Sequence, residues 1–220
     1  MSKIDTKPIH QYVVEMMKDL KGIVELYTVN RKEVATVEEN TMLSREYKDE
    51  QIAKVKERLL ANCRSQFDAL QEHFEKLIEV MRENDNIYDF SEPEFASCIT
   101  LLSATDRPLP LETVLGIAGK FLGNRQALIA LSEVAKGTNK TTLTERVFNT
   151  EVEAERLQER LIELDVNFPK SILMIPTFKD DLLKIARMCG EELTNAEKDL
   201  GADYQDIVNM QMRAAMGLGE

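Results

Sequence analysis

The sequence has few aromatic residues and no long apolar run. There is no Trp, and aromatic residues make up only 6% of the 220 residues, against 10 Met and 30% charged residues. This balance favours long helices over a β-sandwich, because strands are rich in aromatic and β-branched residues. No segment approaches the ~18 apolar residues of a membrane-spanning helix. The first ten residues contain no apolar signal-peptide core. We therefore expect a soluble, cytoplasmic protein without a membrane partner.

Cysteine and histidine are also scarce. Cys63, Cys98 and Cys189 are isolated and show no CxxC spacing, which predicts buried free thiols in a reducing compartment rather than disulfides. His10 and His73 have no cysteine, histidine or carboxylate set at the spacing of a zinc site. A solvated or helix-edge histidine is the simpler interpretation, and we expect no metal and no cofactor.

Known catalytic motifs are absent from the sequence. The segment GIAGKF at 116–121 has Val114 where a phosphate-binding loop needs Gly, and Phe121 where it needs Ser or Thr. Gly116 and Gly119 are therefore interpreted as sites of close helix packing. There is no GxSxG, HExxH or EF-hand pattern, and spacing alone singles out no acid/base pair among the carboxylates. We predict that the protein is not an enzyme and has no small-molecule substrate.

The net charge of −11 is unevenly distributed. Residues 1–60 are neutral, residues 61–140 carry −4, and residues 141–220 carry −7 from 9 basic and 16 acidic residues. An acidic surface repels nucleic acid and anionic lipid, and the basic residues do not cluster with aromatics as in a nucleic-acid groove. We expect no nucleic acid partner. A basic partner surface and simple solubility both remain open.

Two long segments carry heptad patterns. In the first, apolar residues recur at alternating spacings of four and three, and Val34 and Val37 continue the register beyond Asn30. The second is expected to be a helix over about 44–83, roughly 60 Å long at 1.5 Å per residue, which needs a partner helix. That partner is either the first helix, folded back as a hairpin, or another subunit. The proposed interaction seams are Ile9, Val13, Met16, Leu20, Ile23 and Tyr27, and Phe67, Leu70, Phe74, Leu77 and Met81.

Capping signals predict shorter helices after residue 90. Ser91 and Glu94 form a capping box that opens a helix to about residue 104, with Pro93 in its first turn. Gly123 and Asn124 separate helices at about 111–122 and 125–136, and Gly137 ends the second.

The last 80 residues are predicted to form three helices. A capping box of Thr142 and Glu145 opens a helix over 143–164, and its inward residues are Val147, Val152, Leu157, Leu161 and Leu164. After Pro169 the apolar stretch 172–176 is expected to be a buried connector. Thr177 is expected to cap a helix to about residue 189, and the last helix is placed at 195–216.

The stretch LPLETVLGIAGKFLGNRQALIALSEVAKG at 109–137 resembles a two-helix module in helical proteins of phages and prophages of Gram-positive bacteria. In that module an aromatic residue, a Gly or Asp, and an Asn separate two short helices, and Phe121, Gly123 and Asn124 fill those places here. The charged segment SREYKDEQIA at 44–53 is similar to that family too. The resemblance covers about residues 40–140. It implies a gene near head-structural genes and no catalytic residues.

Together these observations predict an all-α fold with at least about 65% helix, twice the usual share. A long-helix coiled-coil region at 1–86 is followed by a small helical module at 91–137 and an acidic helical region at 142–220. We expect a non-enzymatic phage-type protein in the bacterial host cytoplasm or the virion. It would act through contacts with itself, as a homo-oligomer with a dimer as the expected state, and with a phage structural protein during head assembly. The alternative is an acidic inhibitor or adaptor that binds a basic host protein, as a nucleic-acid mimic.

Overall fold

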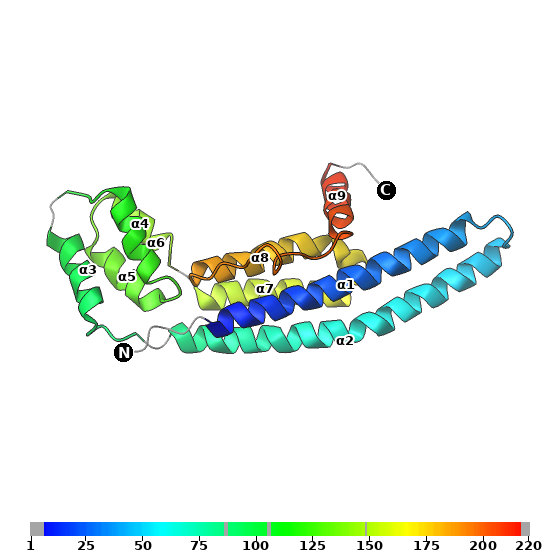
Figure 1. The fold of residues 1–220 in the computed structure, drawn as a ribbon, viewed down its shortest axis with the longest axis horizontal. Coiled ribbons are helices and arrows are strands. Elements are labelled where there is room, and N and C mark those ends of the chain that lie inside the picture. The colour runs from blue at the N-terminus through cyan, green and yellow to red at the C-terminus, as the bar shows by residue number, and fades with distance from the viewer. Residues whose placement is uncertain (1–6, 86–87, 105–106, 148, 217–220) are drawn as a thin grey trace. The chain divides into compact units, whose positions relative to one another are not determined.

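A computed structural model of the chain is all-α (Figure 1). The structure describes residues 7–85, 88–104, 107–147 and 149–216. In this part of the chain there are nine α-helices, one 3-10 helix and no strand, and its residues are 78% helical. The prediction of an all-α fold with at least about 65% helix is confirmed.

Two long helices open the chain, as the heptad patterns predict. Helix α1 spans Lys7–Glu39 and helix α2 spans Arg45–Asp85. In the turn between them, the Asn40 side chain accepts a hydrogen bond from the Met42 N–H at 3.0 Å. Ser44 Oγ accepts from the Tyr47 N–H at 3.3 Å, which satisfies one of the free amide donors at the start of α2. The helices therefore reverse direction at a short capped turn.

The next three helices lie close to their predicted positions, but only one of their two predicted caps is present. Helices α3 and α4 cover Pro93–Ala104 and Leu111–Lys120, and α5 covers Arg125–Val134. The predicted cap at Asn124 is confirmed, because its side chain accepts from the Ala127 N–H at 2.8 Å. The predicted Ser91 capping box is wrong. The Ser91 hydroxyl donates to Asp89 Oδ1 at 2.6 Å, and the Glu94 carboxylate accepts from Lys120 Nζ at 2.7 Å.

The single helix predicted over 143–164 is two helices. Helix α6 spans Thr138–Thr144, directly after Gly137, and α7 spans Thr150–Val166. Thr142 lies inside α6, where its hydroxyl donates to the Thr138 carbonyl at 3.1 Å, so it does not cap a new helix. Gly137 precedes α6 rather than ending α5, which stops three residues earlier. Of the predicted inward residues, Leu157, Leu161 and Leu164 are buried and Val152 is exposed.

The C-terminal helices also begin at other residues than predicted. The connector at 172–176 is a 3-10 helix, η1, at Lys170–Met174, and it runs directly into α8 at Ile175–Met188. Thr177 therefore lies within α8, where its hydroxyl accepts from Gln211 Nε2 at 3.1 Å. Helix α9 spans Tyr204–Ala215, nine residues later than expected, because Gly201 with φ +93° follows a turn at residues 195–198.

The chain folds into two compact units. Unit 1 comprises residues 1–11, 76–155 and 183–192, and unit 2 comprises residues 12–75, 156–182 and 193–220. Each unit is therefore assembled from three separate stretches of sequence, whereas the regions predicted at 1–86, 91–137 and 142–220 are continuous stretches.

Unit 1 has an apolar core built by helices α3 to α6. The rings of Phe95 and Phe121 meet edge to face with centroids 5.7 Å apart, and Tyr88 lies 5.2 Å from Phe95. The turn between α4 and α5 is fixed where the Gly123 N–H donates to the Met188 carbonyl at 2.9 Å. The buried core consists of Phe95, Cys98, Leu102, Val114, Ile117, Ala118, Phe121, Ala127, Leu128, Leu131, Ala135 and Leu143.

Unit 2 packs the α1–α2 hairpin against residues of α7, η1, α8 and α9. Phe168 joins these layers, with its ring 5.3 Å from Phe67 and 6.4 Å from Tyr27. Arg160 and Asp181 form an ion pair at 2.5 Å between α7 and α8. The loop end of the hairpin extends past the other helices of this unit (Figure 1), and most of its residues are exposed.

Candidate functional site

The two predicted seams lie inside the fold. Ten of their eleven residues are buried in the single chain, and Tyr27 is partly buried. Leu70 and Leu77 are fully buried, with 0% exposure. The heptad pattern thus identified core-facing stripes. In this structure the seam side chains are not on a surface that another subunit could reach.

The two histidines each face one carboxylate. His73 Nδ1 lies 2.7 Å from Asp19 Oδ2 in unit 2, and His10 Nδ1 lies 3.5 Å from Glu191 Oε2 in unit 1. Burial raises the pKa of Asp19, and the hydrogen bond from His73 opposes that shift. In the described ranges no three His, Cys, Asp or Glu residues gather closely enough to hold a metal ion. These pairs are therefore interpreted as structural contacts.

Other residues singled out by the sequence have simple surroundings. Cys63, Cys98 and Cys189 are buried free thiols, and burial raises the pKa of Cys63 to about 12. The interpretation of Gly116 and Gly119 as close-packing sites is wrong, because a Cβ at either position would meet nothing within 4 Å. Both glycines lie on the exposed side of α4.

The outward side of α7 in unit 2 combines acidic and apolar side chains. Ile162 is 52% exposed and Val166 is 74% exposed. Glu159 and Glu163 lie on the same side of the helix, at spacings of three and four residues, and both are exposed. Neither carboxylate forms an ion pair within the described residues, unlike Asp165, which lies 3.9 Å from Arg64. We call Glu159, Ile162, Glu163 and Val166 the α7 face.

Unit 1 exposes several apolar side chains of its own. On α3 and α4, Leu101 is 42% exposed, Leu111 58% and Leu115 37%. Phe90, just before α3, is 48% exposed, although its ring lies 5.3 Å from that of Phe95. Single exposed apolar residues are normal on protein surfaces, so none of these residues by itself indicates a binding site.

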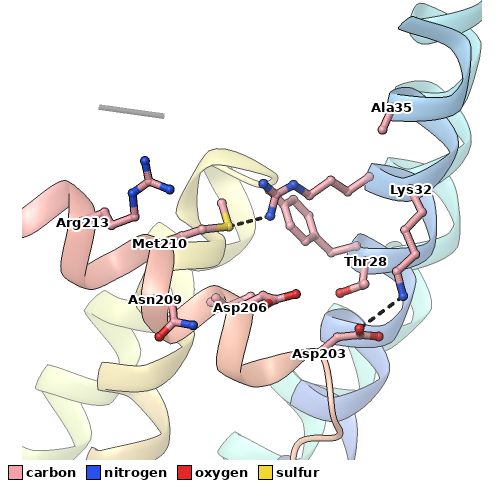
Figure 2. Close-up of a pocket in the computed structure, with 11 residues that line it drawn as sticks. Thr28, Lys32, Ala35, Asp203, Asp206, Asn209, Met210 and Arg213 are labelled. Atoms are coloured by element: carbon pink, nitrogen blue, oxygen red, sulfur yellow. Dashed lines mark hydrogen bonds and ion pairs between the residues drawn. The ribbon is translucent and has the colours of Figure 1, made fainter. Parts of the chain in front are cut away.

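Unit 2 also contains a pocket of about 470 Å³ between α1 and the α9 segment (Figure 2). Lys32 Nζ lies 3.2 Å from Asp203 Oδ1 across one side of it. On the other side the Arg31 Nη1 donates to the thioether sulfur of Met210 at 2.8 Å. The pocket is lined by Tyr27, Thr28, Arg31, Lys32, Ala35, Asp203, Asp206, Ile207, Asn209, Met210 and Arg213.

Sequence reasoning did not identify this pocket, except that Tyr27 belongs to the first seam. Its two walls are separated by about 170 residues, as in the Arg31–Met210 contact with a separation of 179. The only local signal is that Asp203, Asp206, Met210 and Arg213 recur at helical spacing on one side of α9. Such a mixed-charge stripe is ordinarily a solvated helix face.

The described residues include no helix that is both long enough and apolar enough to cross a bilayer. Comparison with known proteins gives no match to a family model, to a curated protein or to a solved structure. The resemblance to phage proteins therefore stays a prediction.

Proposed function

We propose that this chain is a non-enzymatic helical protein that acts through protein–protein contacts, in phage head assembly or as a virion component. The phage setting is what the resemblance of residues 109–137 implies. The α7 face is the observation that supports a contact function, because it exposes two β-branched apolar side chains next to two carboxylates that have no partner in the described chain.

The chemistry of the α7 face specifies its partner. Burying Ile162 and Val166 would contribute about 25 cal/mol per Å² of apolar surface removed from water. Glu159 and Glu163 adjoin that patch on one side, so a partner with basic residues beside an apolar surface would satisfy both features. Complementary charges mainly increase the rate of association and its specificity, which predicts binding that weakens with salt.

Co-expression with the major capsid protein encoded in the same genome tests this proposal. We expect the capsid protein to copurify with the wild type and its assembly to change. The double variant Ile162→Asp with Val166→Asp should lose both effects. Leu60→Asp is the matched control, because Leu60 is also an exposed apolar residue of unit 2, at 48% exposure. Unchanged copurification with the double variant, or none with the wild type, would count against the proposal.

An acidic inhibitor or adaptor of a basic host protein is the second candidate. The unpaired Glu159 and Glu163 and the −7 charge of residues 141–220 favour it, since a charged face of this kind can imitate nucleic acid. Pull-down from host lysate over a salt series, with wild type and Glu159→Gln plus Glu163→Gln, separates the candidates. One basic host protein captured only at low salt and only by the wild type supports this candidate. The absence of any salt-sensitive partner eliminates it.

A further inference from the structure

We infer that the pocket between α1 and α9 binds a small molecule that carries one carboxylate on an apolar body. The first observation is a hydroxyl without a partner. Thr28 is only 8% exposed, it lines the pocket, and its hydroxyl forms no hydrogen bond within the described residues. Its side chain is directed toward α9 (Figure 2). A threonine on a helix ordinarily bonds the carbonyl four residues earlier, as Thr36 does with Lys32 at 2.9 Å.

Two guanidinium groups of the pocket also have no anionic partner among the residues that the structure describes. Arg31 donates to the sulfur of Met210 at 2.8 Å, and a thioether is a weak acceptor. Arg213 is exposed and forms no ion pair with any described residue. A guanidinium has five N–H donors and binds carboxylates in a bidentate manner. The pocket therefore offers two arginines and the hydroxyl of a largely buried threonine as donors to an oxyanion.

The charge of the pocket indicates a monoanion. Its lining carries three cations, Arg31, Lys32 and Arg213, and two carboxylates, Asp203 and Asp206. Lys32 and Asp203 already neutralise each other at 3.2 Å. One negative charge on the ligand would balance the rest, whereas a phosphate dianion would add repulsion against Asp206. This favours a carboxylate over a phosphate.

The remaining walls indicate an apolar body. Tyr27, Ala35, Ile207 and Met210 also line the pocket, and Ile207 is only 1% exposed. A volume of about 470 Å³ is much larger than a single carboxylate needs and falls among the volumes of small-molecule sites. An aromatic or aliphatic acid fits this combination of donors and apolar contacts. This inference is independent of the proposed contact function, because the pocket and the α7 face share no residue.

Titration of the full chain with phenylacetate, followed by amide chemical shifts at low salt, tests the inference. We expect saturable shifts in residues 27–35 and 203–213. Neutral phenylacetamide of the same shape should bind at least about tenfold more weakly, since a hydrogen bond to a charged group has about this effect on affinity. Inorganic phosphate should also bind more weakly than phenylacetate. Tighter binding of phosphate would overturn the assignment to a carboxylate, and equal binding of the amide would overturn the anion site.

Two variants separate ligand binding from folding. Arg213→Gln and Thr28→Val should each weaken phenylacetate binding about tenfold. Neither should lower the melting temperature, because the described residues give Arg213 no ion pair and the Thr28 hydroxyl no hydrogen bond. Arg125→Gln, which changes an exposed arginine of unit 1, is the control and should bind as the wild type does. Unchanged affinity in both pocket variants, or no saturable shift in the wild type, would overturn the inference.

Discussion

At the scale of single residues, the surroundings of a polar side chain decide its role in this protein. His73 and Asp19 are 54 positions apart, and they form a contact of 2.7 Å in which both side chains are largely buried. From sequence, His73 is interpreted as a solvated or helix-edge histidine. Packing converts them into a pair, and the desolvated carboxylate then shows a raised pKa.

The raised pKa of Asp19 predicts a pH dependence of stability. At pH values between the pKa of 3.8 that Asp19 has in the unfolded chain and its higher pKa in the folded chain, the folded state binds more protons than the unfolded state. The contribution of Asp19 to stability therefore rises as pH falls. Urea unfolding of wild type and Asp19→Asn from neutral pH to about pH 4 should therefore show the difference, wild type minus variant, increasing on acidification. Repeating the pair in a His73→Gln background removes the protonation of the histidine itself. A difference that shrinks on acidification in this background would contradict the assignment.

The three buried thiols predict slow chemistry in the native state. Because the thiolate is the reactive species, a pKa of about 12 keeps Cys63 protonated at mildly alkaline pH. Burial raises the pKa of Cys98 as well. We expect a thiol reagent such as Ellman's reagent to label the native protein very slowly, and to label all three cysteines rapidly in denaturant. Rapid labelling of one cysteine in the native state would show that its site opens to solvent.

At the scale of secondary-structure elements, local capping motifs predicted some helix starts correctly and others wrongly. Asn124 caps α5 because its side chain reaches the amide of Ala127, three residues on. Thr142 has the same kind of spacing to Glu145, yet α6 already begins at Thr138 and the hydroxyl bonds back into it. A capping motif gives a favourable site without showing that a helix starts there, because neighbouring helices compete for the same residues.

The turn between α4 and α5 allows a matched pair of glycine substitutions. Gly123 has φ +79°, and an added Cβ would lie 3.2 Å from the backbone Cα of Cys189. We expect Gly123→Ala to lower the free energy of unfolding by about 1–3 kcal/mol. Gly116→Ala should raise it by about 0.5–1 kcal/mol, because that glycine lies within a helix with open space around it. Chemical denaturation of both variants measures the contrast, and equal effects would show that the turn tolerates a side chain.

At the scale of the whole molecule, the apolar stripes predicted as an interface between subunits are buried within one chain. Helix α1 has 33 residues and helix α2 has 41, so the two long helices can cover each other over most of their length within one chain. The homo-oligomer stays a prediction, and its contacts would have to use exposed surfaces such as the α7 face.

A double substitution distinguishes core from interface. Leu70 and Leu77 are both 0% exposed, and an uncompensated buried charge costs several kcal/mol. Leu70→Asp with Leu77→Asp should therefore reduce helicity and abolish cooperative unfolding, as measured by circular dichroism. Sedimentation of the wild type at micromolar concentration gives the oligomeric state. A variant that remains fully helical and sediments at half the mass of the wild type would show instead that the seams join two subunits.

The sequence by itself determined the fold class, the two long helices and their core-facing residues. These follow from periodicity, because a stripe such as Val13, Met16 and Leu20 must be buried wherever the helix packs. Tertiary structure alone decided which distant polar groups meet, including His73 with Asp19 and Arg31 with Met210. It also divided the predicted helix over 143–164 and placed α9 beside α1 to form the pocket. The physical reason is range: helical periodicity acts over three or four residues, whereas these contacts join residues 54 and 179 positions apart.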